Sequence, residues 1–167
     1  MGVEGQIYIG ALIATWVGVS FDSLPALIHL PLTILAGCLG GALWAFIPGY
    51  LKATRGFNEI ILSIFMNFIA INLLGASVNT FLKVPGQGIP WSPRILQSAQ
   101  IPRIPGTTVH FGLLLVFLLA LWIAYVLNNR TFGYEIKTVG ANRDAAVFGG
   151  INTSKVIIIT MVISGAI

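Results

Sequence analysis

Long uncharged, apolar stretches recur along the chain. Residues 5–21, 32–51, 60–78 and 109–127 carry no charged side chain, and a fifth apolar stretch covers residues 156–167. A helix that crosses a bilayer needs about 20 mostly apolar residues, so the first four stretches reach or approach that length and the fifth does not. The apolar residues run continuously instead of alternating, which favours helices over barrel strands. The pattern predicts an all-α, polytopic transmembrane helix bundle with four full spans and the start of a fifth.

Composition supports this interpretation and excludes several other classes of protein. Hydrophobic residues make up 56% of the 167 residues and charged residues only 8%, whereas about a quarter of the residues in a soluble domain are charged. All charged side chains lie outside the five apolar stretches, as expected from the cost of about 2.5–3.5 kcal/mol for a charge at mid-bilayer. A single cysteine and two distant histidines predict no disulfide, metal site or cofactor. The cations are too scattered for a nucleic-acid partner.

The basic residues predict the orientation in the membrane. Six of the nine cations lie next to the second stretch or in the link after the fourth: Lys52, Arg55, Arg130, Lys137, Arg143 and Lys155. Both links must lie on the same side of a bilayer, and basic residues favour the cytoplasmic side. The sequence therefore predicts a multi-pass protein of the cell (inner, plasma) membrane.

The predicted outside loop, about residues 79–108, is long and rich in proline. It holds Pro85, Pro90, Pro93, Pro102 and Pro105, together with apolar residues such as Trp91. Loops of this length are usually functional or disordered. Two interpretations remain open, a cap packed on the helices and an outer gate or docking surface for a delivery protein. His29, placed in the preceding outside link near Pro31, and His110, at the outer end of a span, are interpreted as interfacial residues.

Small and polar residues inside the spans predict helix contacts. Gly37, Gly41, Ala45 and Gly49 recur at every fourth position, which lets helix backbones approach closely in lipid. Asn67 and Asn72 are amides within the third stretch, and each needs a partner or a water-filled cavity. Hydrogen bonding between helices and a substrate path are both open for them, and Asn67, nearer the middle of the span, suits a path better.

The inside link, about residues 129–154, carries the pattern of one short helix. Asn142 is a predicted N-cap with Asp144 in the first turn, and Gly149 or Gly150 is predicted to end the helix in a left-handed conformation. A helix of about seven residues is marginal alone in water and must pack on something. Ala145 and Ala146 would let another surface come close. A linker packed on its own bundle and a partner-docking helix are both open at this point.

Nothing in the sequence predicts catalysis. It contains neither G-x-x-x-x-G-K-[ST] nor G-x-G-x-x-G, and no H-E-x-x-H motif or carboxylate pair at helical spacing. The spans also lack the ionisable residues that a membrane-embedded enzyme would need. The chain is therefore predicted not to be an enzyme.

Four stretches together resemble one family. The inside link, Gly140-Ala141-Asn142-Arg143-Asp144-Ala145-Ala146 followed by Gly150-Ile151, is similar to the coupling motif of permease subunits of bacterial ABC importers. The relevant branch handles simple sugars, nucleosides and branched-chain amino acids. Gly2-Val3-Glu4-Gly5-Gln6 resembles the branch's N-x-G-x-E-G-Q motif. Leu51-Lys52-Ala53, with Gly56-Phe57-Asn58-Glu59 and Met66-Asn67, resembles its L-K-A…G-x-N-E…M-x-N motif. Ile163-Ser164-Gly165-Ala166 resembles the start of its next helix. The chain looks most like the nucleoside-type permeases.

The resemblance implies a function and a set of partners. The chain would be a single transmembrane permease domain, residues 1–167, incomplete at both ends, because the family's first motif begins before Met1 and the last stretch stops at Ile167. It would form the path of an ATP-driven importer for nucleosides or simple sugars. Its partners would be cytoplasmic ABC ATPase subunits, a second permease subunit that is identical or homologous, an extracytoplasmic substrate-binding protein and the lipid membrane.

The resemblance also assigns roles to residues. Coupling to the ATPase would fall on Gly140, Asn142, Arg143, Asp144, Ala145, Ala146, Phe148 and Gly150. Polar groups along the substrate path would include Glu4, Gln6 and Asn67. The alternative is a channel or secondary transporter without an ATPase partner, which would need no docking helix in the inside link and would work without ATP.

Overall fold

The computed structural model describes residues 4–84, 86, 88–89, 91–106 and 109–167. Met1, Gly2, Val3, Pro85 and Pro90, named above, lie outside the described residues. The described helices are α1 (Glu4–Ser20), α2 (Ala26–Arg55), α3 (Glu59–Asn79), the 3₁₀ turn η1 (Gln97–Ala99), α4 (Gly112–Asn129), α5 (Thr131–Ala141), α6 (Arg143–Phe148) and α7 (Thr153–Ala166). In the described part of the chain the other ordered pairing is an isolated bridge between Arg103 and His110.

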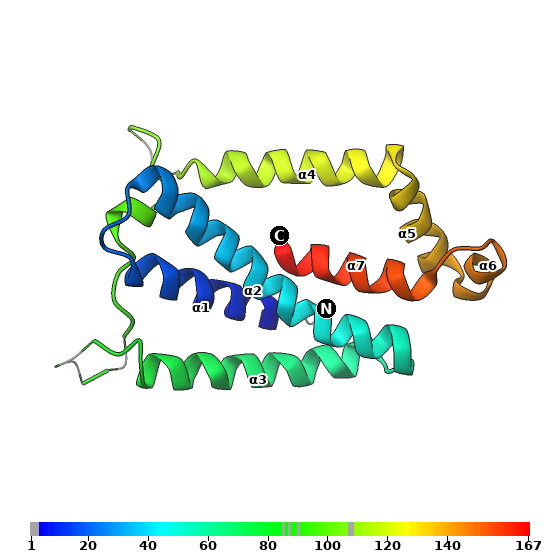
Figure 1. The fold of residues 1–167 in the computed structure, drawn as a ribbon, viewed down its shortest axis with the longest axis horizontal. Coiled ribbons are helices and arrows are strands. Elements are labelled where there is room, and N and C mark those ends of the chain that lie inside the picture. The colour runs from blue at the N-terminus through cyan, green and yellow to red at the C-terminus, as the bar shows by residue number, and fades with distance from the viewer. Residues whose placement is uncertain (1–3, 85, 87, 90, 107–108) are drawn as a thin grey trace.

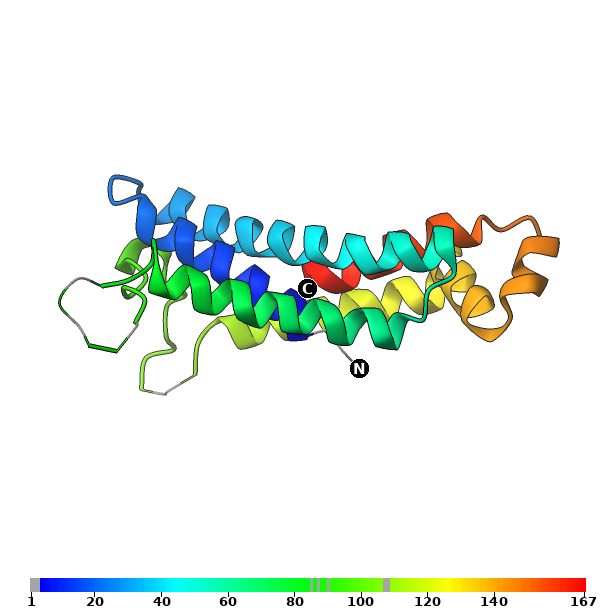
Figure 2. The same cartoon turned by 90° about the horizontal axis from the view of Figure 1, so that it is seen from below.

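The predictions of an all-α fold and of apolar helices that could span a membrane are confirmed. Among the residues that the structure describes, three helices, α2, α3 and α4, are long and apolar enough to cross a membrane. α1 has 17 residues and α7 has 14. The molecule is elongated, with α5 and α6 at one end and the α1–α2 turn and the described parts of the α3–α4 link (80–84, 86, 88–89, 91–106 and 109–111) at the other (Figures 1 and 2).

Glycine contacts hold the centre of the bundle together, where α2 packs against α1 and α7 (Figure 1). A Cβ atom on Gly41 would overlap the carbonyl oxygen of Gly165, and one on Gly165 would overlap that of Gly41. Gly37 faces Gly10 of α1 in the same manner, with a Cβ on Gly10 meeting the Gly37 oxygen at 3.0 Å. The prediction that the small residues of α2 serve helix packing is therefore confirmed.

The start of α2 differs from the expectation. The helix begins at Ala26, so Pro31 lies inside it and His29 belongs to its first turns rather than to a link. His29 is 0% exposed, and the interpretation of this residue as interfacial is wrong. Burial is tolerated because both ring nitrogens have partners, Ser98 Oγ at 2.8 Å and the Val17 carbonyl at 3.2 Å. A buried polar group that is hydrogen-bonded escapes most of the desolvation penalty.

The α3–α4 link packs on the helices, which supports the cap interpretation for its central part. The amide of Leu96 donates to the Gly18 carbonyl at 3.1 Å, and Ala99 of η1 is buried. The amide of Phe111 donates to the Pro102 carbonyl at 3.1 Å where the link returns to α4. Trp91, by contrast, remains exposed. The link thus combines an anchored centre with an exposed apolar side chain.

Candidate functional site

The short helix predicted in the inside link is present as α6. Asn142 Oδ1 accepts hydrogen bonds from the amides of Asp144 and Ala145, both at 3.0 Å, so Asn142 is the N-cap. Gly150, with φ of 79°, is the residue that adopts the left-handed conformation after the helix. The amide of Ile151 then closes the turn on the Ala146 carbonyl at 3.0 Å. These contacts satisfy both ends of a helix that is too short to be stable alone.

One side chain of α6 is buried within the chain, and others are exposed. Ala146 is 0% exposed and packs inside the chain, whereas Phe148 is 93% exposed. Val147 and Ala145 are also exposed. Of the two alanines proposed to let another surface approach, only Ala145 is accessible in this structure, because Ala146 is completely buried. An aromatic ring as exposed as Phe148 is the type of side chain that anchors protein interfaces.

Two hydrogen bonds tie this end of the chain to α2. Arg143 Nη2 and Ser154 Oγ both donate to the Ala53 carbonyl, each at 3.3 Å. Ala53 is within the last four residues of α2, whose carbonyls have no partner inside the helix. Lys52 forms an ion pair with Glu59 across the adjoining turn, and Asn58 caps α3 through the Ile60 amide at 2.9 Å. The first residue of α6 and the first turn of α7 are therefore bonded to the end of a long helix.

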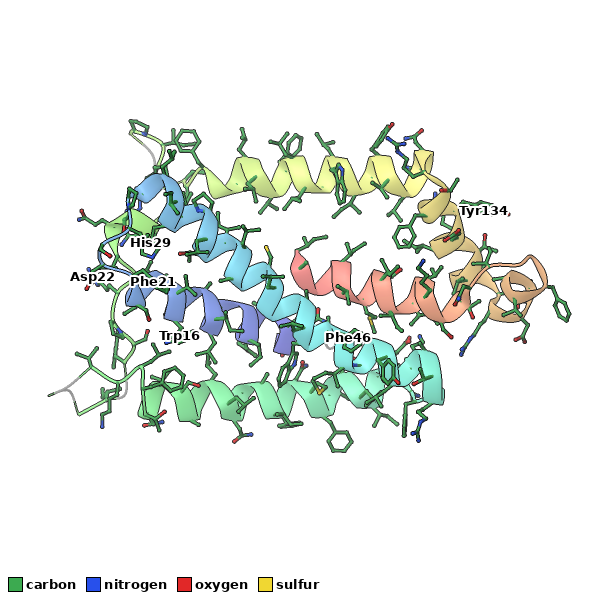
Figure 3. All side chains as sticks on the ribbon, viewed as in Figure 1. Trp16, Phe21, Asp22, His29, Phe46 and Tyr134 are labelled. Carbon is green, nitrogen blue, oxygen red and sulfur yellow. The ribbon has the colours of Figure 1, made fainter. Side chains whose placement is uncertain are left out.

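α5 was not anticipated by the sequence analysis. Gly133 packs so closely on the end of α4 that a Cβ would overlap the Val126 carbonyl, and Lys137 Nζ donates to Asn128 Oδ1 at 2.9 Å. The opposite side of α5 carries the exposed Tyr134 (Figure 3). A usable signal was the apolar spacing of Phe132, Ile136 and Val139. The two glycines of the segment, poor helix formers, obscured it.

The predicted path residues meet at the start of α1. The Gly5 amide donates to Asn67 Oδ1 at 2.7 Å, which brings Asn67 of α3 beside the neighbours of Gly5. Gln6 is buried and Glu4 is exposed. Asn72, the other amide of α3, is exposed and donates only to the Phe68 carbonyl of its own helix at 2.7 Å. Asn67 thus joins two helices, and Asn72 does not.

Trp44 is a member of this cluster that the sequence did not suggest. Its indole nitrogen is the one buried side-chain polar atom without a partner in the described residues. An ideal Cβ on Gly5 would lie 3.0 Å from Trp44 Nε1 and 2.9 Å from Asn67 Oδ1, so both polar groups flank the same backbone position. The start of α1 therefore combines an amide, an indole N–H and the buried Gln6 within one small region.

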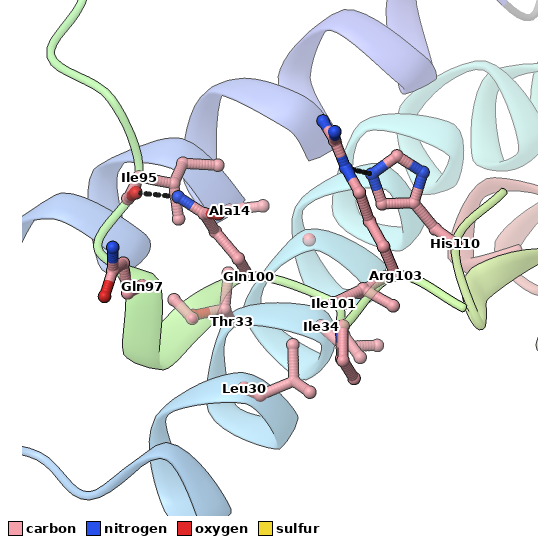
Figure 4. A pocket seen from close by; sticks show the side chains of 13 residues that line it. Ala14, Leu30, Thr33, Ile34, Ile95, Gln97, Gln100, Ile101, Arg103 and His110 are labelled. Carbon is pink, nitrogen blue, oxygen red and sulfur yellow. Dashed lines mark hydrogen bonds between the residues drawn. The ribbon is translucent and has the colours of Figure 1, made fainter. Parts of the chain in front are cut away.

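Cavities occur at two levels of the bundle. One of about 780 Å³ lies between α1, α2 and the α3–α4 link, and Arg103 Nε donates to His110 Nε2 at 3.2 Å on its rim (Figure 4). His110 is exposed next to the start of α4, as expected of an interfacial residue. A second, of about 420 Å³, is lined by Gln6 of α1, Cys38 of α2 and Ser164 of α7. Gln6 therefore faces open space between three helices.

Removal of the α6 cap is expected to loosen the helix measurably. Asn142→Ala deletes the acceptor of two amide hydrogen bonds, which costs about 1 kcal/mol at an N-cap and corresponds to about fivefold faster amide exchange. The rate of hydrogen exchange at the Asp144 and Ala145 amides measures this loss of protection. Asn142→Asp keeps an acceptor at the cap and serves as the control. Equal exchange in all three proteins would contradict the capping role.

Comparisons with known proteins agree with the structure. Residues 1–167 match the family described as branched-chain amino acid transport system / permease component. The chain is 36% identical to the guanosine ABC transporter permease NupP of Bacillus subtilis over 99% of its own length and 48% of that protein. It is 37% identical to the glucose ABC transporter permease TsgB13 of Haloferax volcanii over 99% of its length and 46% of that protein. It is 28% identical to the nucleoside ABC transporter permease NupB of Lactococcus lactis over its entire length and 48% of that protein.

Two further findings define the reach of these similarities. The chain spans about half the length of the curated relatives it matches. No solved structure gives a significant match. The match of the family over all 167 residues agrees with the three described helices that are apolar and long enough to span a membrane. The chain belongs to the family of permease components of branched-chain amino acid transport systems.

Proposed function

We propose that the protein is the membrane-spanning permease subunit of an ATP-driven importer for nucleosides or simple sugars. Family membership supports transport, and the names of the relatives, which carry guanosine, glucose or nucleosides, support the substrate class. The observation that carries the coupling to ATP is α6, a capped helix that buries Ala146 and exposes Phe148 almost completely. A helix built in this way presents a rigid apolar anchor to another protein.

The proposed topology places four spans in the membrane. α1 to α4 would cross it, and α7 would begin a fifth crossing. At about 1.5 Å per residue α1 covers about 25 Å, close to the thickness of the hydrocarbon core. The six cations of α2, the α5–α6 region and the start of α7 favour a cytoplasmic location for that end. The α3–α4 link would then face outward.

The coupling link carries motion in this proposal. Two cytoplasmic ABC ATPase subunits would bind ATP, and each would receive Phe148 of one permease subunit in an apolar groove. Closure of the ATPases would displace α6, and the bonds of Arg143 and Ser154 to the Ala53 carbonyl would carry that displacement to α2. Gly140 and Gly150 flank this segment, and no atom lies within 4 Å of a Cβ built on either residue. The space around the glycines is compatible with movement of the helix.

The substrate path would run along the start of α1. Asn67, Gln6 and Glu4 offer amide and carboxylate groups, which suit the hydroxyl groups of a ribose or hexose. A second permease subunit, identical or homologous, would complete the path on the opposite side. A substrate-binding protein outside the membrane would deliver the solute to the α3–α4 link.

Uptake into proteoliposomes tests the proposed function. The full-length permease, reconstituted with its ATPase and binding protein, is expected to accumulate labelled guanosine or glucose only when ATP is hydrolysed. A hydrolysis-deficient ATPase provides the control. Uptake that continues without ATP would instead establish the channel or secondary transporter alternative.

Asn67→Leu is expected to lower the rate of uptake while leaving assembly intact. The change removes the acceptor for the Gly5 amide and leaves a buried donor unpaired, which costs about 1–3 kcal/mol at the start of α1. Asn72→Leu is the matched control, because Asn72 is exposed and bonds only within α3. Initial uptake rates and co-purification with the ATPase measure the two effects. Unchanged kinetics in Asn67→Leu would remove Asn67 from the substrate path.

A further inference from the structure

His29 joins three segments that are far apart in the sequence. It lies in α2 and is completely buried, with Nε2 at 3.2 Å from the Val17 carbonyl of α1 and Nδ1 at 2.8 Å from Ser98 Oγ of η1. A carbonyl oxygen only accepts, so Nε2 carries the proton and Nδ1 accepts from the Ser98 hydroxyl. In this tautomer the ring therefore donates to α1 and accepts from the α3–α4 link.

The partners of His29 are groups that need an external hydrogen bond. Val17 and Gly18 lie in the last four residues of α1, whose carbonyls have no partner inside the helix. His29 Nε2 donates to the Val17 carbonyl, and the Leu96 amide donates to the Gly18 carbonyl at 3.1 Å. A Cβ on Gly18 would meet Ile95 Cγ2 at 2.9 Å, so the link lies directly on the end of α1. These contacts form a clamp of three residues, His29, Ser98 and Leu96.

The helix that carries His29 also accepts the two hydrogen bonds at the Ala53 carbonyl near its other end. α2 is 30 residues long, and at about 1.5 Å per residue roughly 36 Å of it separates His29 from the Ala53 carbonyl that accepts from Arg143 and Ser154. The two ends of the molecule in Figure 1 are thus fastened to one continuous helix. A displacement of the segment that holds Leu96 and Ser98 requires these contacts to break or α1 and α2 to move with it.

We propose that His29 is a positioning residue that fastens the α3–α4 link to α1 and α2, and that α2 transmits a displacement of this link to α6. The transmission step rests on the proposed function, because it needs a protein that docks on the link and an ATPase that contacts α6. The clamp itself does not. Energetic coupling of this kind acts in both directions, so a change at α6 also alters the link.

Ser98→Ala tests the clamp without touching the buried ring. The variant removes the hydroxyl that donates to His29, and hydrogen exchange of the segment around Leu96 is expected to rise about tenfold, the equivalent of one lost buried hydrogen bond. Ser98→Thr keeps a hydroxyl and is expected to restore protection. Gln100→Ala is the matched control, since Gln100 Nε2 donates only to Ile95 within the link at 2.7 Å.

The same variants test transmission in the reconstituted importer. Stimulation of ATP hydrolysis by the binding protein is expected to fall several-fold in Ser98→Ala, with the basal rate unchanged, and to recover in Ser98→Thr. Unaltered exchange in Ser98→Ala would overturn the clamp. Faster exchange with full stimulation would overturn transmission through α2. A wild-type complex without any stimulation would overturn the proposed function together with transmission, and the exchange data would still decide the clamp.

Discussion

Gly41→Leu is expected to separate α7 from α2 and to abolish the stable fold of the permease. The backbones of Gly41 and Gly165 are so close that a single Cβ on either would overlap the carbonyl oxygen of the other. Overpacking by one or a few methylene groups costs about 1–3 kcal/mol where side chains can adjust. Here the obstacle is backbone on both sides, so relief requires the helices to move apart and the cost lies at or above that range.

Gly75→Leu is the matched control for this experiment. Gly75 lies inside α3, and no atom lies within 4 Å of an ideal Cβ at that position. The same replacement there is expected to leave stability unchanged or to raise it slightly, because leucine is a better helix former than glycine. The midpoint of thermal unfolding of the detergent-purified permease measures both variants. Equal midpoints would show that the contact of α2 with α7 does not hold the bundle together.

Phe148→Ser is expected to weaken the binding of the ATPase about 30-fold. Phe148 is 93% exposed at the end of α6 and is the largest apolar side chain that this helix presents. Truncation of a central aromatic anchor typically costs 2 kcal/mol or more of binding free energy, which corresponds to that factor. The fold of the permease itself is expected to be unaffected, since the ring has almost no contacts within the chain.

Two further variants distinguish the effect of an apolar side chain at residue 148 from the effect of losing any exposed phenylalanine. Phe148→Leu keeps an apolar anchor and is expected to retain most of the affinity. Phe57→Ser removes another exposed phenylalanine, in the turn between α2 and α3, and is expected to have little effect. Titration of ATPase binding to the permease in nanodiscs measures all three. Equal losses for Phe148→Ser and Phe57→Ser would show that the ATPase does not recognise α6 in particular.

The apolar stretches and the polar ends of helices were predictable because their causes are local. Uncharged runs of sufficient length dictate helices in a bilayer, and the caps at Asn142 and Asn58 follow from the preference of a short amide side chain for the first free amides of a helix. The spacing of Gly37 and Gly41 likewise indicated close packing before its partners, Gly10 and Gly165, were known.

The features that escaped prediction depend on contacts between distant segments. His29 reads as a polar residue beside a proline, and only the positions of Val17 and Ser98 explain its burial. The sequence does not distinguish the adjacent residues Ala145 and Ala146, yet the folded chain exposes Ala145 and buries Ala146. The bond between Asn67 and Gly5 joins residues 62 positions apart, so hydrophobic periodicity holds no information about it.

Cross-linking from α6 tests most directly the claim that ATP-driven motion enters the permease at this helix. In a Cys38→Ser background, Ala145→Cys, which leaves the Phe148 ring in place and lies at an exposed position of α6, is expected to form a specific cross-link with an ATPase subunit in the assembled importer when labelled with a thiol-reactive photocross-linker, and Phe57→Cys is expected to give little product. The cross-link is also expected to block uptake, since it prevents relative movement of the two proteins. Efficient ATP-dependent uptake with Ala145→Cys fully cross-linked, or an assembled importer that gives no cross-link from this position, would contradict the account.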